Sequence, residues 1–525
     1  MPAPTDTTAA TAPVLIAGDW RDADASSTFA ATNPATGEVL PGVFPVSRWS
    51  DLDAALDAAD GAFEQLQELP AEKIAAFLDR YADKIDADNE ELAKLGEAET
   101  ALPAATRLGK VEIPRTSNQL RLCAKAARLG EWAMPTLDTG ANIRSMHVAI
   151  GPVVVSGPNN SPFAFHGISG GDFAAAIASG NPVIAKGHPL HPGTTRRLGE
   201  LAKQALEETG LPAATVQLLY HFDNDDGLKL VADPRVGATA FTGSRKGGLA
   251  LKAAADAAGK PAYLEMSSVN PVVLLPSALD QKADDLAAEY ATSCLMGVGQ
   301  FCTNPGLVFV VKGEPADAFL DGVKAKFEAA EPGTLFADSG VKSLGGGVDT
   351  LARSGATVVT GGEAAGGCRY ANTLLRATGD AFLKAPADLQ TEAFGNAGLV
   401  VVCDSVDQIA ACLRHLEGNL TGCIYSGEGD DADYATVEKP LRRRVGRLLN
   451  DKMPTGVAVS PAMVHGGPYP STGHGGFTAV GPPASLRRFS LLRCYDHVAP
   501  SRLPPLLRDD NPGDGFRYVE GQWTK

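Results

Sequence analysis

The chain has few of the features that mark disulfide-rich, metal-ribbon or membrane proteins. Its eight cysteines are scattered over 525 residues and none forms a Cys-x-x-Cys pair, so neither a disulfide framework nor a zinc ribbon is indicated. No uninterrupted apolar stretch reaches the ~20 residues that a bilayer-spanning helix needs. The first residues, Met-Pro-Ala-Pro-Thr-Asp, lack the basic and apolar regions of a signal peptide. We expect a cytoplasmic protein without a membrane partner.

Basic residues are fewer than acidic residues. The chain has 46 Lys and Arg against 62 Asp and Glu, a formal net charge of −16. Such an acidic balance argues against polyanionic partners, so no nucleic-acid partner is expected. The local basic run Arg442–Arg444 is interpreted as a solvated surface.

Apolar residues and glycine are abundant. With 44% hydrophobic residues in 525, the chain is too long for a single hydrophobic core, and two or three domains are expected. The 57 glycines accompany Val- and Ile-rich runs that alternate with Ala-rich stretches. This alternation predicts an α/β fold with parallel strands.

The order of predicted elements is typical of a nucleotide-binding sheet. Residues 1–12 are small, polar and proline-containing, which predicts a disordered lead. The register of strands and helices restarts near 271–276, where we place a domain boundary. The expected elements are helices over 51–68, 71–95, 163–179 and 193–208, and extended segments over 146–156, 181–186, 215–220 and 237–244.

Two segments carry the chemistry. Cys302 lies in Gly-Gln-Phe-Cys-Thr-Asn-Pro-Gly (299–306), and Glu265, 302 − 265 = 37 residues earlier, lies in Leu-Glu-Met-Ser-Ser-Val-Asn-Pro (264–271). An isolated cysteine is usually a small buried apolar residue, and an isolated glutamate is usually solvated. Here a substrate carbonyl can closely approach a thiol in a glycine-flanked turn, and a carboxylate can activate the water that releases the acyl group. The pair indicates covalent acyl chemistry.

The two histidines of Lys-Gly-His-Pro-Leu-His-Pro-Gly-Thr (186–194) raise the question of a metal. Pro189 and Pro192 interrupt His188 and His191, and no carboxylate lies at ligand spacing. We predict that no metal is bound.

Together these motifs resemble the aldehyde dehydrogenase superfamily, from Gly18 to about Pro500. The chain is similar in particular to the branch with α-ketoglutaric semialdehyde dehydrogenases and NADP-linked fatty-aldehyde dehydrogenases. Three stretches carry this resemblance: 186–194, Gly-Gln-Phe-Cys-Thr-Asn-Pro-Gly-Leu (299–307) and Pro-Ala-Met-Val-His-Gly-Gly-Pro-Tyr-Pro (461–470).

The resemblance implies an α/β aldehyde dehydrogenase-like fold in three parts. The expected parts are a Rossmann-like dinucleotide-binding domain (13–130 and 151–273), an α/β catalytic domain (274–482) and a small β oligomerisation element (131–150 and 483–500). An element of this kind needs a partner to cover its strand edge, so a homodimer or homotetramer is expected.

The resemblance also implies the catalytic roles. Cys302 is the nucleophile that forms a thiohemiacetal and then a thioester, and Glu265 is the base for thioester hydrolysis. Asn160 and the backbone N–H of Cys302 are the oxyanion donors. From the residues alone, an Asx-turn that caps the following helix is the favoured role of Asn160, and the adjacent Asn159 leaves the register of this match open.

Cofactor-binding residues follow from the same resemblance, which implies NADP or NAD. Glu392 in Thr-Glu-Ala-Phe-Gly (391–395) matches the carboxylate that binds the nicotinamide ribose, with Phe394 beside it. No Gly-x-Gly-x-x-Gly motif is present, and Gly243 and Ser244 precede an Ala-rich helix whose N-terminus could face the pyrophosphate. Lys186, His188 and Pro189 are expected at the adenine ribose.

The choice between the two dinucleotides stays open. Pro189 stands where NAD-preferring relatives have a carboxylate, which favours a 2′-phosphate. Three acidic residues in the loop after Leu219 would repel one: Asp223, Asp225 and Asp226.

The expected substrate is an aldehyde, in particular α-ketoglutaric semialdehyde (2,5-dioxopentanoate). A long-chain fatty aldehyde is the alternative, and the sequence does not reveal which side chains line the tunnel. Three departures from the family pattern, Ser267, His221 and Asn396, motivate a further alternative, a nucleotide-binding scaffold without turnover.

Overall fold

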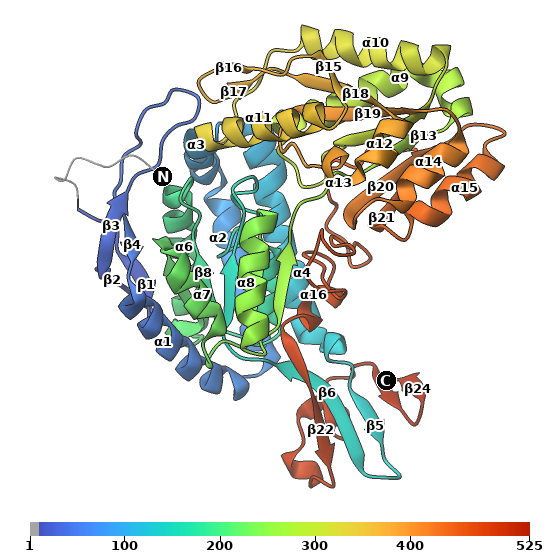
Figure 1. The fold of residues 1–525 in the computed structure, drawn as a ribbon. Coiled ribbons are helices and arrows are strands. Elements are labelled where there is room, and N and C mark those ends of the chain that lie inside the picture. Colours follow the sequence, from blue (N-terminus) through green and yellow to red (C-terminus); the bar gives the residue numbers. More distant parts are fainter. Residues whose placement is uncertain (1–9) are drawn as a thin grey trace.

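The computed structural model describes residues 10–525, and two seven-stranded sheets and a smaller five-stranded sheet dominate it (Figure 1). The first large sheet has the order β12-β11-β7-β8-β9-β1-β2, in which β12 to β9 run parallel and β1 and β2 form an antiparallel edge. Its strands are β1 (Val14–Ile16), β2 (Asp19–Arg21), β7 (Val153–Ser156), β8 (Val183–Lys186), β9 (Val216–Leu219), β11 (Ala238–Thr242) and β12 (Ala262–Glu265).

Strand order reverses at β7, which lies between β8 and β11. Ligands of open α/β sheets bind at the carboxyl ends of the strands beside such a switch point. A small sheet of order β10-β4-β3 lies outside this seven-stranded sheet. It comprises β3 (Ala25–Phe29), β4 (Phe44–Ser47) and β10 (His221–Phe222).

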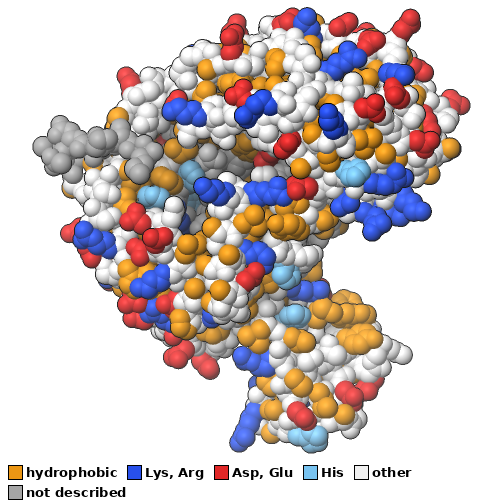
Figure 2. All heavy atoms as spheres, in the orientation of Figure 1, with side chains coloured by type: hydrophobic (Ala, Val, Ile, Leu, Met, Phe, Trp, Pro, Cys, Tyr) orange, Lys and Arg blue, Asp and Glu red, His pale blue; other side chains and the backbone are white. Residues whose placement is uncertain are grey.

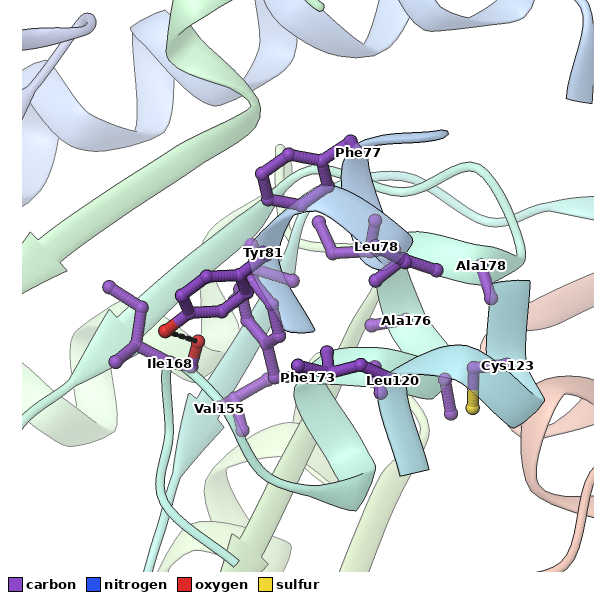
Figure 3. Packing of buried hydrophobic residues seen from close by; sticks show 14 of the residues in the cluster. Phe77, Leu78, Tyr81, Leu120, Cys123, Val155, Ile168, Phe173, Ala176 and Ala178 are labelled. Carbon is purple, nitrogen blue, oxygen red and sulfur yellow. Dashed lines mark hydrogen bonds between the residues drawn. The ribbon is translucent and has the colours of Figure 1, made fainter. Parts of the chain in front are cut away.

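Helices within residues 49–257 bury their apolar faces against the first seven-stranded sheet. Tyr81 is completely buried, and its hydroxyl donates to the carbonyls of Ile168 (3.2 Å) and Leu198 (3.1 Å). Figure 3 shows Phe77 and Phe173 packed around it. The helices are α1 (Trp49–Gln67), α2 (Ala71–Ala87), α3 (Asn89–Thr100), the π-helix η1 (Ala104–Glu112), α4 (Ile113–Leu129), α5 (Gly171–Ala178), α6 (Pro192–Thr209), α7 (Asn224–Ala232) and α8 (Arg245–Ala257).

Three expectations for this part were wrong in detail. The helix predicted over 163–179 begins only at Gly171, because the preceding residues form a turn whose first N–H groups, Phe163 and Ala164, bind the carboxylate of Glu112. The helix predicted over 71–95 is two helices, separated at Asp88 (φ −97°, ψ 10°). Residues 1–9 of the predicted lead lie outside the described residues, whereas Ala12 is ordered by a 2.7 Å bond from its N–H to the carbonyl of Val43.

The second large sheet has the order β15-β18-β19-β14-β13-β20-β21 and is parallel except for β15. Its strands are nearly continuous apolar runs, as expected where helices cover both faces. They are β13 (Val272–Leu274), β14 (Leu307–Val311), β15 (Thr357–Thr360), β18 (Thr373–Thr378), β19 (Ala397–Cys403), β20 (Asn419–Tyr425) and β21 (Val445–Asn450); a separate ribbon pairs β16 (Ala364–Gly366) with β17 (Arg369–Tyr370). The helices are α9 (Pro276–Leu295), α10 (Glu314–Ala329), α11 (Asp338–Arg353), α12 (Gly379–Lys384), α13 (Pro386–Leu389), α14 (Val406–Arg414) and α15 (Asp431–Leu441).

The third sheet joins distant segments in the order β22-β6-β5-β23-β24 and protrudes from the rest of the chain (Figure 1). The two segments predicted for the oligomerisation element do pair in it, as β6 with β22. The sheet also extends past residue 500, because β23 pairs in parallel with β5 and covers that strand's edge. The elements are β5 (Thr136–Asp138), β6 (Ile143–Ala149), β22 (Ser490–Asp496), β23 (Arg517–Val519) and β24 (Gln522–Thr524), preceded by α16 (Ala484–Arg487).

Hydrophobic side chains gather on the protruding sheet (Figure 2). Leu492 of β22 is 66% exposed and Trp523 of β24 is 55% exposed. Within residues 10–525, no helix combines the length and apolar character that crossing a bilayer would require.

Candidate active site

The parallel strands of the first sheet bring several predicted site residues to one edge. Lys186 is the last residue of β8 and Glu265 the last of β12, while Asn160 follows β7 and Gly243 and Ser244 follow β11. All these positions are at carboxyl ends of neighbouring strands, so they face the same crevice.

The second sheet contributes Cys302 from the turn between the 3₁₀ helix η4 (Met296–Gly299) and β14. The side-chain amide of Asn270 donates to the carbonyls of Cys302 (2.9 Å) and Asn304 (2.8 Å), which fixes this turn. Gly299 has a φ of +67°, and a Cβ there would lie 2.0 Å from the carbonyl oxygen of Gly395. Only glycine allows the backbone at 299 to lie this close to Gly395. This explains the glycine near the thiol.

The two sheets meet at a cluster of three side chains. His465 Nε2 lies 3.3 Å from Cys302 Sγ and 3.0 Å from Glu265 Oε1. His465 and Glu265 are each 1% exposed. The three ligand atoms lie within 4.8 Å of one another, so thiol, imidazole and carboxylate can exchange a proton.

The loop after β21 carries His465 to the end of β12. Met266 donates its N–H to the carbonyl of Ser471 (2.8 Å), and Glu265 forms an isolated bridge with Thr472. On its other side, the carbonyl of Glu265 accepts the N–H of Gly243 (3.1 Å). These contacts fix the backbone on both sides of the carboxylate.

Burial dominates the electrostatics of the thiol. It raises the pKa of Cys302 well above the usual thiol value, the nearby Glu265 carboxylate adds to this, and the Arg115 guanidinium opposes it. In this arrangement the sulfur is a protonated thiol at neutral pH and needs a proton acceptor before it can attack.

Asn160 lies beside the turn that carries Cys302. Its side-chain Nδ2 donates to the carbonyl of Gln300, two residues before Cys302, at 2.9 Å. The alternative role as a helix cap does not apply, because α5 begins eleven residues later and its N-terminus has no side-chain cap. An amide nitrogen carries two N–H groups, so one remains for an oxyanion.

The residues expected at the adenine ribose are partly buried. Lys186 Nζ donates to the carbonyl of Gly187 (3.3 Å) and lies 5.4 Å from the centre of the Phe222 ring. Burial lowers the pKa of Lys186 to about 8. Within residues 10–525 this ammonium has no acidic partner, an observation that suits a site for an anionic or polyhydroxylated ligand.

His188 and Pro189 follow Lys186 in a loop. His188 Nδ1 accepts the N–H of Leu190 (3.2 Å), and its ring stacks on His191 at 5.2 Å. Burial lowers the pKa of His188 well below its usual value, so the imidazole is neutral. The stacked rings of His188 and His191 stabilise this turn.

The pyrophosphate and nicotinamide ends also have identifiable groups. Ser244 caps α8, its hydroxyl accepting the N–H of Gly247 (3.2 Å), which leaves the other first-turn N–H groups available for an anion. Glu392 Oε1 accepts the N–H of Ser268 (3.3 Å), and burial raises the pKa of Glu392 to about 7. Phe394 and Glu392 line one small cavity together with Ser268.

The departures from the family pattern have structural partners. The side chain of Ser267 lies near Glu392 and lowers the pKa of that carboxyl against the effect of burial. Asn396 is fully buried, and its Nδ2 donates to Tyr370 O (2.8 Å) and Asn372 Oδ1 (2.7 Å). Neither residue interrupts the cluster around Cys302.

Sequence reasoning missed two residues near the thiol, His465 and Arg115. His465 lies in the stretch 461–470, where a histidine followed by two glycines was an available signal for a residue in a tightly packed turn. Arg115 had no such signal, because an arginine on a long helix is usually solvated.

Comparison with known proteins identifies relatives of the chain. The model of the aldehyde dehydrogenase family matches residues 20–472. The chain is 39% identical to alpha-ketoglutaric semialdehyde dehydrogenase 2 of Azospirillum brasilense, covering 95% of this chain and 97% of that protein. It is 34% identical to alpha-ketoglutaric semialdehyde dehydrogenase of Acinetobacter baylyi, covering 92% and 93%.

Solved structures share the fold. PnpE from Pseudomonas sp. WBC-3 superposes with a TM-score of 0.79 at 22% identity, covering 93% of this chain and 97% of that one. 3,6-anhydro-L-galactose dehydrogenase in complex with NAP gives a TM-score of 0.79 at 22% identity, covering 93% and 99%.

Proposed function

The chain belongs to the aldehyde dehydrogenase family, and from this we propose that it oxidises α-ketoglutaric semialdehyde to the dicarboxylate with NAD or NADP. The family makes it an oxidoreductase acting on aldehydes. The observation that carries the mechanism is the meeting of Cys302, His465 and Glu265 within 4.8 Å. The proposed substrate is inferred from the names of the two relatives at 39% and 34% identity, and these names do not favour a fatty aldehyde.

Attack on the aldehyde begins with loss of the Cys302 proton. The acceptor is the His465–Glu265 pair, reached through Nε2 at 3.3 Å from the sulfur. A thiolate so formed is stabilised by the positive charge of Arg115. Its addition to the carbonyl carbon forms the C–S bond of a thiohemiacetal and places negative charge on the former carbonyl oxygen.

Asn160 is the side-chain donor for that oxygen. Its amide is held by the 2.9 Å bond to Gln300 O, so its orientation is set before the substrate arrives. Preorganised donors act on the charge that develops in the transition state, and one such donor is worth about 3–4 kcal/mol in other acyl-transfer sites.

The dinucleotide, when bound, supplies the hydride acceptor for the oxidation. The residues that would hold it are Lys186, His188 and Pro189 at the adenosine end, Gly243 and Ser244 at the pyrophosphate, and Glu392 and Phe394 at the nicotinamide ribose. The unpaired ammonium of Lys186 and the capped N-terminus of α8 fit such a ligand.

Loss of hydride leaves an acyl group on Cys302 as a thioester. Glu265 then removes a proton from water as the water oxygen attacks the acyl carbon, and the C–S bond breaks. Before this step, the proton taken from the thiol must leave the His465–Glu265 pair to solvent. The burial of this carboxylate and the backbone contacts on both sides of it support this second role.

The choice between NAD and NADP depends on the charge near the adenine ribose. His221 lies in the segment after Leu219, where NADP-linked relatives have a phosphate-binding arginine, and burial lowers its pKa to about 4, so it is neutral. Lys186, with a pKa of about 8, is a cation at this site. Solved structures of the same fold hold nicotinamide adenine dinucleotide in one case and NAP in another, and we retain both as cofactors of this chain.

Replacing His465 by glutamine is expected to slow the acylation half of the reaction. The substitution removes the nitrogen that joins thiol and carboxylate, and a hydrogen bond to a charged group is worth about 1.5–3 kcal/mol, or roughly 10–100-fold in kcat/KM. The pKa of the Cys302 thiol is already raised by burial, and the substitution removes its proton acceptor. The ascending limb of the plot of kcat/KM against pH should therefore move to higher pH. Rapid-mixing measurements should show a slower burst of reduced cofactor; an unchanged burst and pH profile would contradict this role.

The substrate proposal is tested by the four combinations of two aldehydes and two dinucleotides. We expect purified protein to reduce NAD or NADP with α-ketoglutaric semialdehyde at a lower KM than with a long-chain aliphatic aldehyde. The reverse preference would replace the proposed substrate, and absence of turnover with retained dinucleotide binding would support the inactive-scaffold alternative.

The assembly and surroundings of the chain are part of the proposal. The protruding sheet exposes apolar side chains and the free edge of β22, which supports a homodimer or homotetramer in which a second copy covers them. A mass of one chain in light scattering would contradict this.

All eight cysteines are free, which supports a cytoplasmic location. Recovery from an oxidising compartment after cell fractionation would count against this location. We retain the three-part domain division, which limited proteolysis can test.

A further inference from the structure

We infer that Arg115 of α4 recognises the carboxylate of the substrate and thereby makes the site selective for short anionic aldehydes. The inference rests on the proposed oxidation of a semialdehyde and names the residue that gives it specificity. An anionic aldehyde carries a group that a guanidinium binds with two parallel hydrogen bonds.

Arg115 is a partly buried cation for which the described residues provide no ion-pair partner. Its Nε and Nη2 are buried and make no hydrogen bond, and throughout residues 10–525 no carboxylate forms an ion pair with it. Burial of an unpaired charge is costly, and burial lowers the pKa of this guanidinium. A ligand that supplies the missing carboxylate would compensate for this cost.

The other two arginines near the thiol are already occupied. Arg107 of η1 is paired with Glu112 (2.6 Å), whose second oxygen accepts the N–H groups of Phe163 and Ala164. Arg447 of β21 donates to the carbonyl of Pro454 at 2.8 Å, and its other terminal nitrogen donates to Gly456. Arg107 and Arg447 each keep one buried Nε without a hydrogen bond, but among the described residues Arg115 is the one of the three whose terminal nitrogen Nη2 is also buried and unbonded.

Successive contacts place Arg115 close to the reacting centre. Its guanidinium carbon lies 4.8 Å from the centre of the Phe165 ring. The Phe165 ring centre lies 5.5 Å from that of His465, whose Nε2 is 3.3 Å from Cys302 Sγ. Arg115 also lowers the pKa of the Cys302 thiol, as a cation this close must.

This placement suits an aldehyde whose far end is charged. A five-carbon semialdehyde held at Cys302 would direct its carboxylate away from the sulfur, along the side of the site on which Phe165 and Arg115 lie. A long aliphatic aldehyde would instead leave the guanidinium buried and unpaired, which disfavours that substrate.

The test compares Arg115→Gln with a matched control on the same helix. Arg121 is 40% exposed and paired with Asp83 and Asp86, far from any proposed role, so Arg121→Gln should behave as wild type. Each protein is assayed with α-ketoglutaric semialdehyde and with uncharged pentanal, and with a second matched pair, succinic semialdehyde and butanal. Dinucleotide binding and circular dichroism report folding.

We expect Arg115→Gln to lower kcat/KM for the anionic aldehydes about 100-fold, mainly through KM, relative to the uncharged ones. Both classes will lose some rate because Arg115 also stabilises the thiolate, so the ratio between them is the readout. Arg115→Lys, which keeps the charge but not the planar fork, should restore part of the ratio. An equal loss for both classes, or no loss for either, would overturn the inference.

The two proposals can fail separately. If wild-type protein oxidises pentanal and succinic semialdehyde but not α-ketoglutaric semialdehyde, the proposed substrate is wrong while the anion preference set by Arg115 is still measured. If wild type shows no preference for either anionic aldehyde over its uncharged match, the role of Arg115 is wrong whatever the substrate.

Discussion

Alanine at position 302 is expected to abolish aldehyde oxidation while leaving dinucleotide binding within about twofold of wild type. The side chain of Cys302 forms the only bond between enzyme and substrate in the proposed reaction, and removing a covalent nucleophile in a comparable site costs about 10⁶-fold in kcat. The predicted cofactor residues end or follow β8, follow β11 or lie between α13 and β19, so none of them belongs to the turn that carries the thiol. Steady-state assays and fluorescence titration with the dinucleotide measure the two effects.

Cys494 supplies the matched control for this substitution. It is exposed on β22, outside the site, so Cys494→Ala should retain wild-type turnover. If Cys302→Ala kept more than about a hundredth of wild-type activity, the nucleophile would have to be another group, since a hundredfold loss corresponds to only about 2.7 kcal/mol.

Glutamine at position 265 is expected to separate the two halves of the reaction. Acylation can still proceed, more slowly, because His465 remains 3.3 Å from the thiol as a proton acceptor. Hydrolysis of the thioester loses its base, which is worth about 10²–10⁴-fold. The result should be a burst approaching one reduced cofactor per subunit, with little turnover afterwards, in rapid-mixing absorbance measurements.

A trapped thioester on Cys302 in the same variant, seen as a mass increase of the intact protein, would identify the stalled step. Glu289 is a suitable control, because its carboxylate bonds the Tyr425 hydroxyl (2.7 Å) in the second part of the chain and has no proposed role. A Glu265→Gln enzyme with an unchanged steady-state rate would remove this carboxylate from the mechanism.

The Glu265 and His465 variants therefore have opposite signatures. Loss of His465 should slow the burst, since proton removal from the thiol precedes hydride loss. Loss of Glu265 should preserve the amplitude of the burst, although acylation is somewhat slower. Its largest effect should be on the steady-state turnover, because that turnover depends on thioester hydrolysis. Finding the same signature in both would mean that the pair acts as one unit, with both residues needed for acylation.

Local sequence was sufficient for much of the architecture. The extended segment predicted over 146–156 contains the buried parallel strand β7, whose apolar run is typical of a strand covered on both faces. The first residues of that segment belong instead to β6 of the protruding sheet, so the single predicted segment is two strands in different sheets. The break near 271–276 falls where the first sheet ends at β12 and the second begins at β13. Predictions failed where a distant side chain competed with local propensity, as when Glu112 bound the N–H groups of residues 163 and 164 and delayed the start of α5.

What the sequence alone determined was the parallel α/β fold and the family to which the chain belongs, together with the turn that presents Cys302, because these depend on short apolar runs and on glycines at fixed places. Only the tertiary structure brought His465 to Glu265, 200 residues away in the chain, and left Arg115 without a partner beside them. Such contacts depend on how two separate sheets meet and on which charges their packing has already neutralised. Neither is a property of any local stretch of residues.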